Sequence, residues 1–135
     1  MVFRPIEKEK NYVMNWIRTS LILVVISIIY LSLKTPSEGI QIRWNDKLGH
    51  LFAYTVLTVN CGLLIKKSNW LYAAVAAFTL SAILEYAQGF VPGRTVEWAD
   101  LLANALGVLL GWTILKVLHP KIVALLQQLR LMRKD

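Results

Sequence analysis

Four long apolar segments alternate with short polar ones along the chain. They span residues 16–33, 48–65, 70–90 and 98–118. Each is close to the ~20 residues that a helix needs to cross ~30 Å of hydrocarbon. A soluble amphipathic helix would carry charged residues opposite its apolar stripe, whereas these segments are apolar nearly all round. The pattern predicts one domain, residues 1–135, folded as an all-α integral membrane four-helix bundle.

The segment after the fourth span has a different pattern. His119 and Pro120 are predicted to end that span, because proline cannot continue the helical hydrogen-bond ladder. Residues 121–132 then place apolar side chains on one helical face: Ile122, Leu125, Leu126 and Leu129. Polar residues lie largely opposite. This pattern predicts a C-terminal amphipathic helix in the cytoplasmic interface.

The distribution of charge predicts how the bundle is oriented. The net charge is +7, which alone would be compatible with nucleic-acid binding. However, eleven of the 15 Lys and Arg residues lie in the N-terminal segment, the loop after the second span or the C-terminal tail. Such a bias marks the cytoplasmic side of a membrane protein. We therefore expect both termini to be cytoplasmic in a multi-pass inner-membrane protein, with lipid rather than nucleic acid as partner.

Polar side chains interrupt the apolar segments at one end of the predicted bundle. Asp46, His50 and Tyr54 are spaced i, i+4 and i+8, so they share one face of the second helix. The other polar residues predicted at this extracytoplasmic end are Glu85, Gln88, Arg94, Asp100 and Asn104. A charged group at the bilayer centre costs at least ~2.5–3.5 kcal/mol, so such residues face the bundle interior and are usually functional. The sequence thus predicts a shared polar pocket.

Structural explanations remain open for individual residues. Asp46 and Asp100 could stabilise helix N-termini, and His50 could simply hydrogen-bond Asp46. Gln88 and Asn104 could join helices, and Arg94 could bind a head-group phosphate. Glu85 is the hardest to explain in this way. Gly107 and Gly111 form a GxxxG pair, which favours close helix packing.

The charges of the predicted pocket leave two alternatives. Asp46, Glu85 and Asp100 outnumber Arg94, and burial together with neighbouring carboxylates raises the pKa of a carboxyl group. Either one carboxyl group is protonated, or the pocket takes up a cation or an ammonium group. The sequence has no HExxH, CxxC, GxSxG or P-loop motif. We therefore expect no cofactor and no metal.

The polar positions resemble those of a known family. The segments that carry the resemblance are DKLGHLFAY at 46–54, EYAQ at 85–88, VPGR at 91–94 and DLLANALG at 100–107. Together they are similar to the VanZ-like family of small bacterial membrane proteins, over about half of the chain. The resemblance implies an inner-membrane location, and the founding member is linked to low-level teicoplanin resistance. It also implies importance for Asp46, His50, Tyr54, Glu85, Gln88, Arg94, Asp100, Asn104 and Gly107.

These observations favour a recognition module. Its pocket would bind the head group of an envelope lipid or lipid-linked precursor, with Arg94 on phosphate or carboxylate. The first alternative is a lipid-modifying enzyme with Glu85 or His50 as general acid–base, and Asp46 and Asp100 as further catalytic candidates. The second is a structural or assembly protein whose polar cluster locks the helices. Proton-linked transport would require a homo-oligomer, because four helices leave little room for a pathway.

Overall fold

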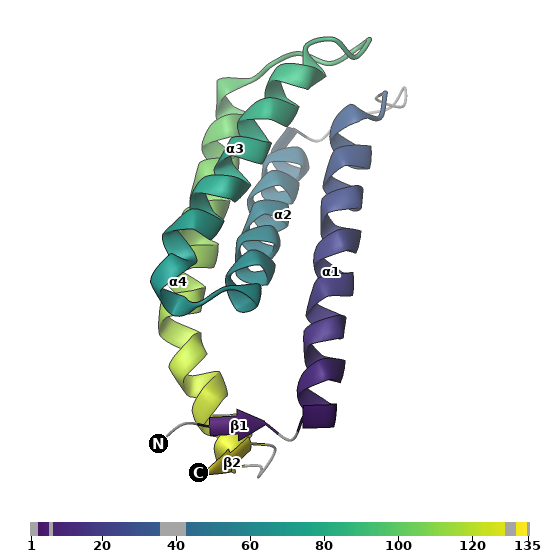
Figure 1. Ribbon diagram of the computed structural model, residues 1–135. Helices are drawn as coiled ribbons and strands as arrows, with labels where there is room; N and C mark the ends of the chain where they lie inside the picture. Colours follow the sequence, from purple (N-terminus) through teal and green to yellow (C-terminus); the bar gives the residue numbers. More distant parts are fainter. Residues whose placement is uncertain (1–2, 6, 36–42, 129–131, 135) are drawn as a thin grey trace.

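Four antiparallel helices make up most of the chain (Figure 1). The computed structural model describes residues 3–5, 7–35, 43–128 and 132–134. The helices are α1 (Glu7–Leu33), α2 (Arg43–Leu64), α3 (Trp70–Gln88) and α4 (Trp98–Gln128), with a short 3₁₀ turn, η1 (Lys67–Asn69), before α3. Strands β1 (Phe3–Pro5) and β2 (Met132–Lys134) pair antiparallel. Both termini therefore lie at the same end of the molecule.

The predicted architecture of four helices is confirmed, with the short β1–β2 pair as an unpredicted addition, but the predicted end of the fourth helix is wrong. α4 does not stop at residue 118; it continues through Pro120 to Gln128. Proline here removes one hydrogen bond, to the Lys116 carbonyl, and the flanking residues are mostly good helix formers. A separate helix over 121–132 is therefore not observed. Its residues 129–131 lie outside the described ranges, and Met132 belongs to β2.

Apolar residues cover the outside of the bundle. Three helical segments in the described ranges are long and apolar enough to cross a membrane, namely Tyr12–Leu33, Lys67–Gln88 and Trp98–Lys121. α2 is not among them; polar residues such as Lys47, His50 and Asn60 lower the mean hydropathy of its sequence. Conversely, several polar residues are buried: Thr58, Ser81, Glu85, Gln88, Asp100 and Asn104. This polar-inside and apolar-outside distribution is expected of a chain solvated by lipid.

α2 occupies the centre of the bundle and packs most extensively on α4. The GxxxG pair of α4 makes this close approach possible. A Cβ atom on Gly107 would collide with the backbone of Leu51, and one on Gly111 would lie 2.7 Å from the Thr55 carbonyl oxygen. The single hydroxyl hydrogen of Thr55 is shared between the Leu51 carbonyl of α2 at 2.7 Å and the Gly107 carbonyl of α4 at 3.1 Å, so Thr55 contacts both helices. Small residues at both α4 positions therefore set the spacing of α2 and α4.

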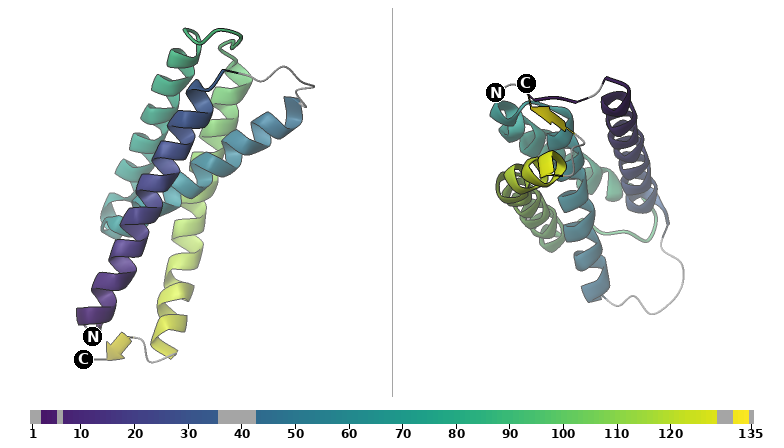
Figure 2. Two further views of the ribbon diagram at one scale, coloured as in Figure 1. Left: turned by 90° about the vertical axis from the view of Figure 1, so that its right-hand side faces the viewer. Right: turned by 90° about the horizontal axis from the view of Figure 1, so that it is seen from below.

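α1 stands at the side of this unit (Figure 2). Its buried Ile28 joins an apolar core made with α2, α3 and α4; the other core members are Tyr54, Leu57, Ala77, Leu84 and Val108. α1 nevertheless keeps most of its large apolar side chains exposed. It is therefore the outermost helix of the bundle and packs against α2 and α3 along one side.

Candidate functional site

The first half of α2 carries the residues of the predicted pocket on one face. Tyr54 is buried and His50 is nearly so, while Asp46, in the first turn, has 58% of its side chain exposed. The Nε2 atom of His50 lies 4.0 Å from an Asp46 carboxylate oxygen, which is too long for a hydrogen bond. The predicted helical stack is thus present, but its first two members do not bond directly.

His50 instead bonds across the bundle to α4. Its Nδ1 atom lies 2.8 Å from Oδ1 of Asn104, a residue that is almost fully buried. With the Asn104 amide oxygen facing the ring, this hydrogen bond requires the tautomer that carries its hydrogen on Nδ1, because an amide oxygen only accepts. The Nε2 lone pair of a neutral His50 therefore remains available on the side of Asp46. Asn104 fixes both the tautomer and the direction of the ring.

A lysine that sequence reasoning missed lies beside this pair. The Lys47 ammonium donates to Asp100 at 2.9 Å and to Glu97 at 3.1 Å. These carboxylates, Asp100 foremost, raise the pKa of Lys47 above its ordinary value. Neither Lys47 nor Glu97 was among the predicted site residues. The available signal was spacing: Lys47 precedes His50 by three residues on one face of α2, and Glu97 precedes Asp100 by three residues at the start of α4.

Glu85 of α3 bonds the same Glu97 that contacts Lys47. Only 4% of the residue is exposed, although it is a carboxylic acid. Its Oε1 atom accepts a hydrogen bond of 3.0 Å from the backbone N–H of Glu97, which immediately precedes α4. Its Oε2 atom is buried and has no hydrogen-bond partner among the described residues. Burying a carboxyl group with only one of its oxygens hydrogen-bonded destabilises the folded protein. Glu85 is therefore a strong candidate for a functional role.

Arg94 has a different position from the one expected of a free anion-binding group. It follows Val91, Pro92 and Gly93, which form a turn closed by a 3.1 Å bond from the Arg94 N–H to the Val91 carbonyl. Gly93 has φ 79°, as a type II turn requires. The Arg94 guanidinium donates to the Leu31 and Lys34 carbonyls at the end of α1. It therefore binds the last turn of α1, with three of its five N–H groups left for other partners.

A cavity of about 570 Å³ opens between α1 and α2. Its α1 wall is mostly apolar, and its polar part gathers near the ends of α2 and α3. The lining residues are Leu23, Val24, Ser27, Ile28, Leu31, Ser32, Asp46, Gly49, His50, Phe52, Ala53, Tyr54, Val56, Gln88 and Arg94. Five predicted residues therefore line one cavity: Asp46, His50, Tyr54, Gln88 and Arg94. Glu85, Asp100 and Asn104 lie in the adjoining polar network instead.

One group of side chains in the described ranges has the composition of a metal site. Asp46, His50 and Asp100 each offer one ligand atom, and these atoms lie within 4.8 Å of one another. Asp46 is exposed, His50 is nearly buried and Asp100 is buried. It therefore connects the cavity, through Asp46 and His50, with the buried network around Asp100.

Comparison with known proteins identifies the family. No curated protein matches the chain, and no solved structure matches it either. The family profile described as VanZ/LLP1 matches residues 2–119, which is most of the chain. The match includes α1, α2, α3, the turn that carries Arg94 and most of α4. The chain belongs to the VanZ/LLP1 family and is a VanZ-like membrane protein.

Proposed function

We propose that this protein recognises the head group of an envelope lipid or lipid-linked precursor in the cavity between α1 and α2. The observation that carries the proposal is the composition of that cavity. Apolar side chains of α1 form one wall, and Asp46, His50, Gln88 and Arg94 form a polar part. An acyl or polyprenyl chain suits the apolar wall, whereas phosphate, amine and hydroxyl groups suit the polar part.

The cavity is accessible from the side of the bundle. Leu23, Leu31 and Phe52 line it and are also exposed on the outer surface. In a membrane that surface faces lipid tails, so a lipid molecule can enter without crossing the apolar core. This arrangement favours a lipid over a water-soluble metabolite.

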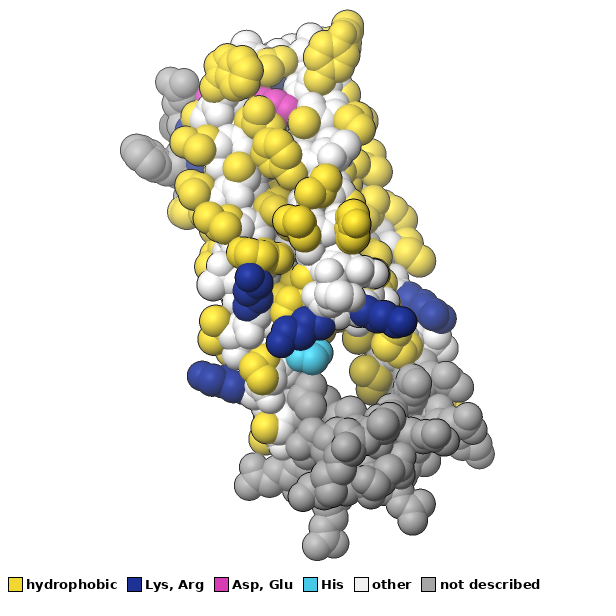
Figure 3. Space-filling view, turned by 60° about the vertical axis from the view of Figure 1, so that its left-hand side comes forward, with side chains coloured by type: hydrophobic (Ala, Val, Ile, Leu, Met, Phe, Trp, Pro, Cys, Tyr) yellow, Lys and Arg dark blue, Asp and Glu magenta, His cyan; other side chains and the backbone are white. Residues whose placement is uncertain are grey.

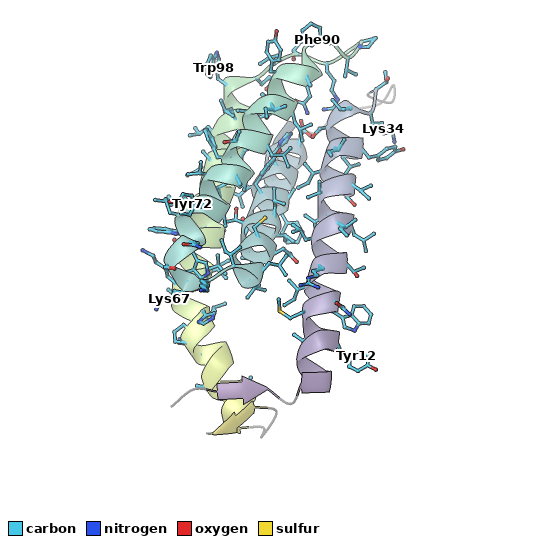
Figure 4. The ribbon with its side chains drawn as sticks, in the orientation of Figure 1. Tyr12, Lys34, Lys67, Tyr72, Phe90 and Trp98 are labelled. Carbon is cyan, nitrogen blue, oxygen red and sulfur yellow. The ribbon has the colours of Figure 1, made fainter. Side chains whose placement is uncertain are left out.

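We also propose that both termini are cytoplasmic and that the polar end of the cavity faces outward. The pairing of β1 with β2 supports an even number of crossings, with α2 as the fourth. On the face shown in Figure 3, Lys and Arg side chains gather toward the end of the bundle nearer the termini, where Lys66, Lys67, Lys116 and Lys121 are exposed, while Asp and Glu are seen near the opposite end. Exposed aromatic residues flank the bundle, with Phe90 and Trp98 near one end and Tyr12 and Tyr72 toward the other (Figure 4). Both features are typical of membrane interfaces.

Gly49→Leu is the variant that tests the cavity most directly. Gly49 lines the cavity, and a Cβ atom added there would meet nothing within 4 Å. A leucine should therefore fill the cavity without disturbing helix packing. We expect the purified variant to keep the melting temperature of the wild type but to retain several-fold less labelled phospholipid or polyprenyl-phosphate lipid. Native mass spectrometry measures both the retained mass and its head group.

Ala76→Leu is the matched control, because Ala76 is exposed on α3 and does not line the cavity. It adds the same side chain to the lipid-facing surface and should leave lipid retention unchanged. Equal retention by the wild type and Gly49→Leu would refute the proposal. Product formation from the retained lipid would instead favour the enzymatic alternative, in which His50 and Glu85 transfer protons.

The resemblance to the teicoplanin-resistance family extends the proposal to glycopeptide susceptibility. A protein that binds a lipid-linked envelope precursor could alter how much of it a glycopeptide reaches. We expect expression of the wild type in a susceptible bacterium to raise the inhibitory concentration of teicoplanin, and expression of Gly49→Leu to raise it less. An unchanged inhibitory concentration would refute the proposed effect on teicoplanin susceptibility. Lipid recognition itself is tested by the binding assay.

A further inference from the structure

We propose that Asp46, His50 and Asp100 bind one divalent transition-metal ion at the polar end of the cavity. Their ligand atoms lie within 4.8 Å of one another and come from two different helices. A tetrahedral zinc ion with bonds of ~2.1 Å holds its ligand atoms about 3.4 Å apart, so small side-chain movements would complete the site. One imidazole and two carboxylates form a ligand set suited to Zn²⁺, and less tightly to Mn²⁺.

The orientation of His50 supports a metal site over a simple polar cluster. Metal-binding histidines normally donate their second ring N–H to a fixed acceptor, which directs the other nitrogen to the ion. Asn104 provides that acceptor at 2.8 Å from Nδ1. The Nε2 atom then faces Asp46 at 4.0 Å, a distance too long for a hydrogen bond but compatible with two ligands of one ion.

Glu85 provides a second and independent observation. Its residue is 4% exposed, and its Oε2 atom has no hydrogen-bond partner among the described residues. Its Oε1 atom accepts from the backbone of Glu97, whose side chain shares the Lys47 ammonium with Asp100, so Glu85 belongs to the same polar network as that ligand. A cation in the site would stabilise this group, whether through a direct bond or through a metal-bound water.

The contacts of the charged groups leave carboxylate oxygens for a further cation. Asp46, Glu85, Glu97 and Asp100 bring four carboxyl groups to this end of the bundle, and Lys34, Arg43, Lys47 and Arg94 bring four cationic groups. Lys47 contacts two of the carboxylates, whereas Arg94 donates to backbone carbonyls. Lys47 donates to Asp100 Oδ1 and leaves further lone pairs of that carboxylate for an ion. Its ammonium is a competitor of the metal, so its removal should strengthen metal binding.

Zinc titration of the whole chain tests the proposal. Chelator-treated, tag-free protein in detergent, without added lipid, is titrated with Zn²⁺ and then Mn²⁺ by isothermal calorimetry. We expect one Zn²⁺ per chain and weaker Mn²⁺ binding. Asp46→Asn should weaken Zn²⁺ binding at least ~10-fold, the range seen when metal sites lose a supporting group. His50→Gln should weaken it as well, and Lys47→Met should strengthen it several-fold.

The design separates metal binding from stability. Asp46 is largely exposed, so Asp46→Asn should fold normally even if His50→Gln does not. His119→Gln is the control: His119 packs on Trp70 near the opposite end of the bundle and should have no effect on Zn²⁺ binding. Absent Zn²⁺ binding by the wild type, or equal binding by Asp46→Asn, would overturn the proposal. Neither outcome depends on lipid recognition, because no lipid is added.

Discussion

At the scale of single residues, the contacts of Lys47 link α2 to α4 directly and to α3 through Glu97. Lys47 lies in the first turns of α2, its ammonium contacts Asp100 of α4, and its second partner, Glu97, contacts Glu85 of α3 through the backbone. Removing Lys47 would leave the mostly buried Asp100 carboxylate without its cation, and such unpaired groups destabilise a fold. Lys47 is therefore expected to stabilise the bundle while it weakens cation binding.

Lys47→Met should lower the melting temperature at neutral pH. The pKa of Lys47 is raised in the folded protein, so its contribution is fully present below the ordinary lysine value of 10.5 and is lost as the pH rises through the higher folded value. The gap between the wild type and Lys47→Met should therefore be constant from pH 7 to pH 9 and shrink above pH 10.5. Thermal melts in detergent at several pH values measure it.

Lys66→Met controls for the general effect of removing a lysine. Lys66 is exposed near the opposite end of α2, so its replacement should change stability little at any of these pH values. A gap between wild type and Lys47→Met that widened with rising pH would contradict the assigned role of Lys47.

At the scale of elements, the seam between α2 and α4 sets the geometry of the site. Gly107 and Gly111 let the α4 backbone approach the α2 backbone, and Thr55 bonds across the seam. This spacing also sets the distance between His50 and Asn104, which are one turn or less from the glycine contact. Site and seam therefore depend on the same helix pair.

Gly107→Ala should destabilise the protein by about 1–3 kcal/mol, the usual cost of adding an atom to a tightly packed interface. The added Cβ would collide with the Leu51 backbone, which cannot move as a flexible side chain can. Gly49→Ala is the matched control: the same change meets nothing within 4 Å and should be neutral or stabilise α2 by up to ~1 kcal/mol. Chemical denaturation in mixed micelles gives the free energy of unfolding of both variants. Equal values would contradict the close packing of α2 on α4 at Gly107.

The sequence could predict the helices because the apolar segments are long and nearly uninterrupted. It could also predict that Asp46, His50 and Tyr54 share a face, because helical spacing is local. It could not predict that Lys47 bonds Asp100, or that Arg94 binds the last turn of α1, since these contacts join residues more than 50 positions apart. The prediction that the helix ends at Pro120 is wrong, because the loss of a single hydrogen bond does not outweigh the helix-forming residues on both sides.

At the scale of the whole molecule, the distribution of lysines makes the orientation testable. Cysteines placed at Ser68, near the predicted cytoplasmic end, and at Thr95, near the opposite end, should react differently with a membrane-impermeant thiol reagent in intact cells. Cys61→Ala removes the native thiol beforehand. We expect labelling of the Thr95→Cys variant in intact cells and of the Ser68→Cys variant only after the membrane is broken. The reverse pattern would refute the proposed orientation.

The two attachments of α1 have a consequence for exchange at the cavity. Arg94 donates to the carbonyls of Leu31 and Lys34 at the C-terminal end of this helix. The N-terminal end follows β1, which pairs with β2. The C-terminal part of α1, from Leu23 to Ser32, forms a cavity wall directly beside the attachment made by Arg94. Widening the lateral entry between α1 and α2 for a bulky head group would therefore require α1 to bow or one of these two attachments to break. The residence time of such a head group would depend on the release of Arg94 as well as on the contacts that the head group makes itself.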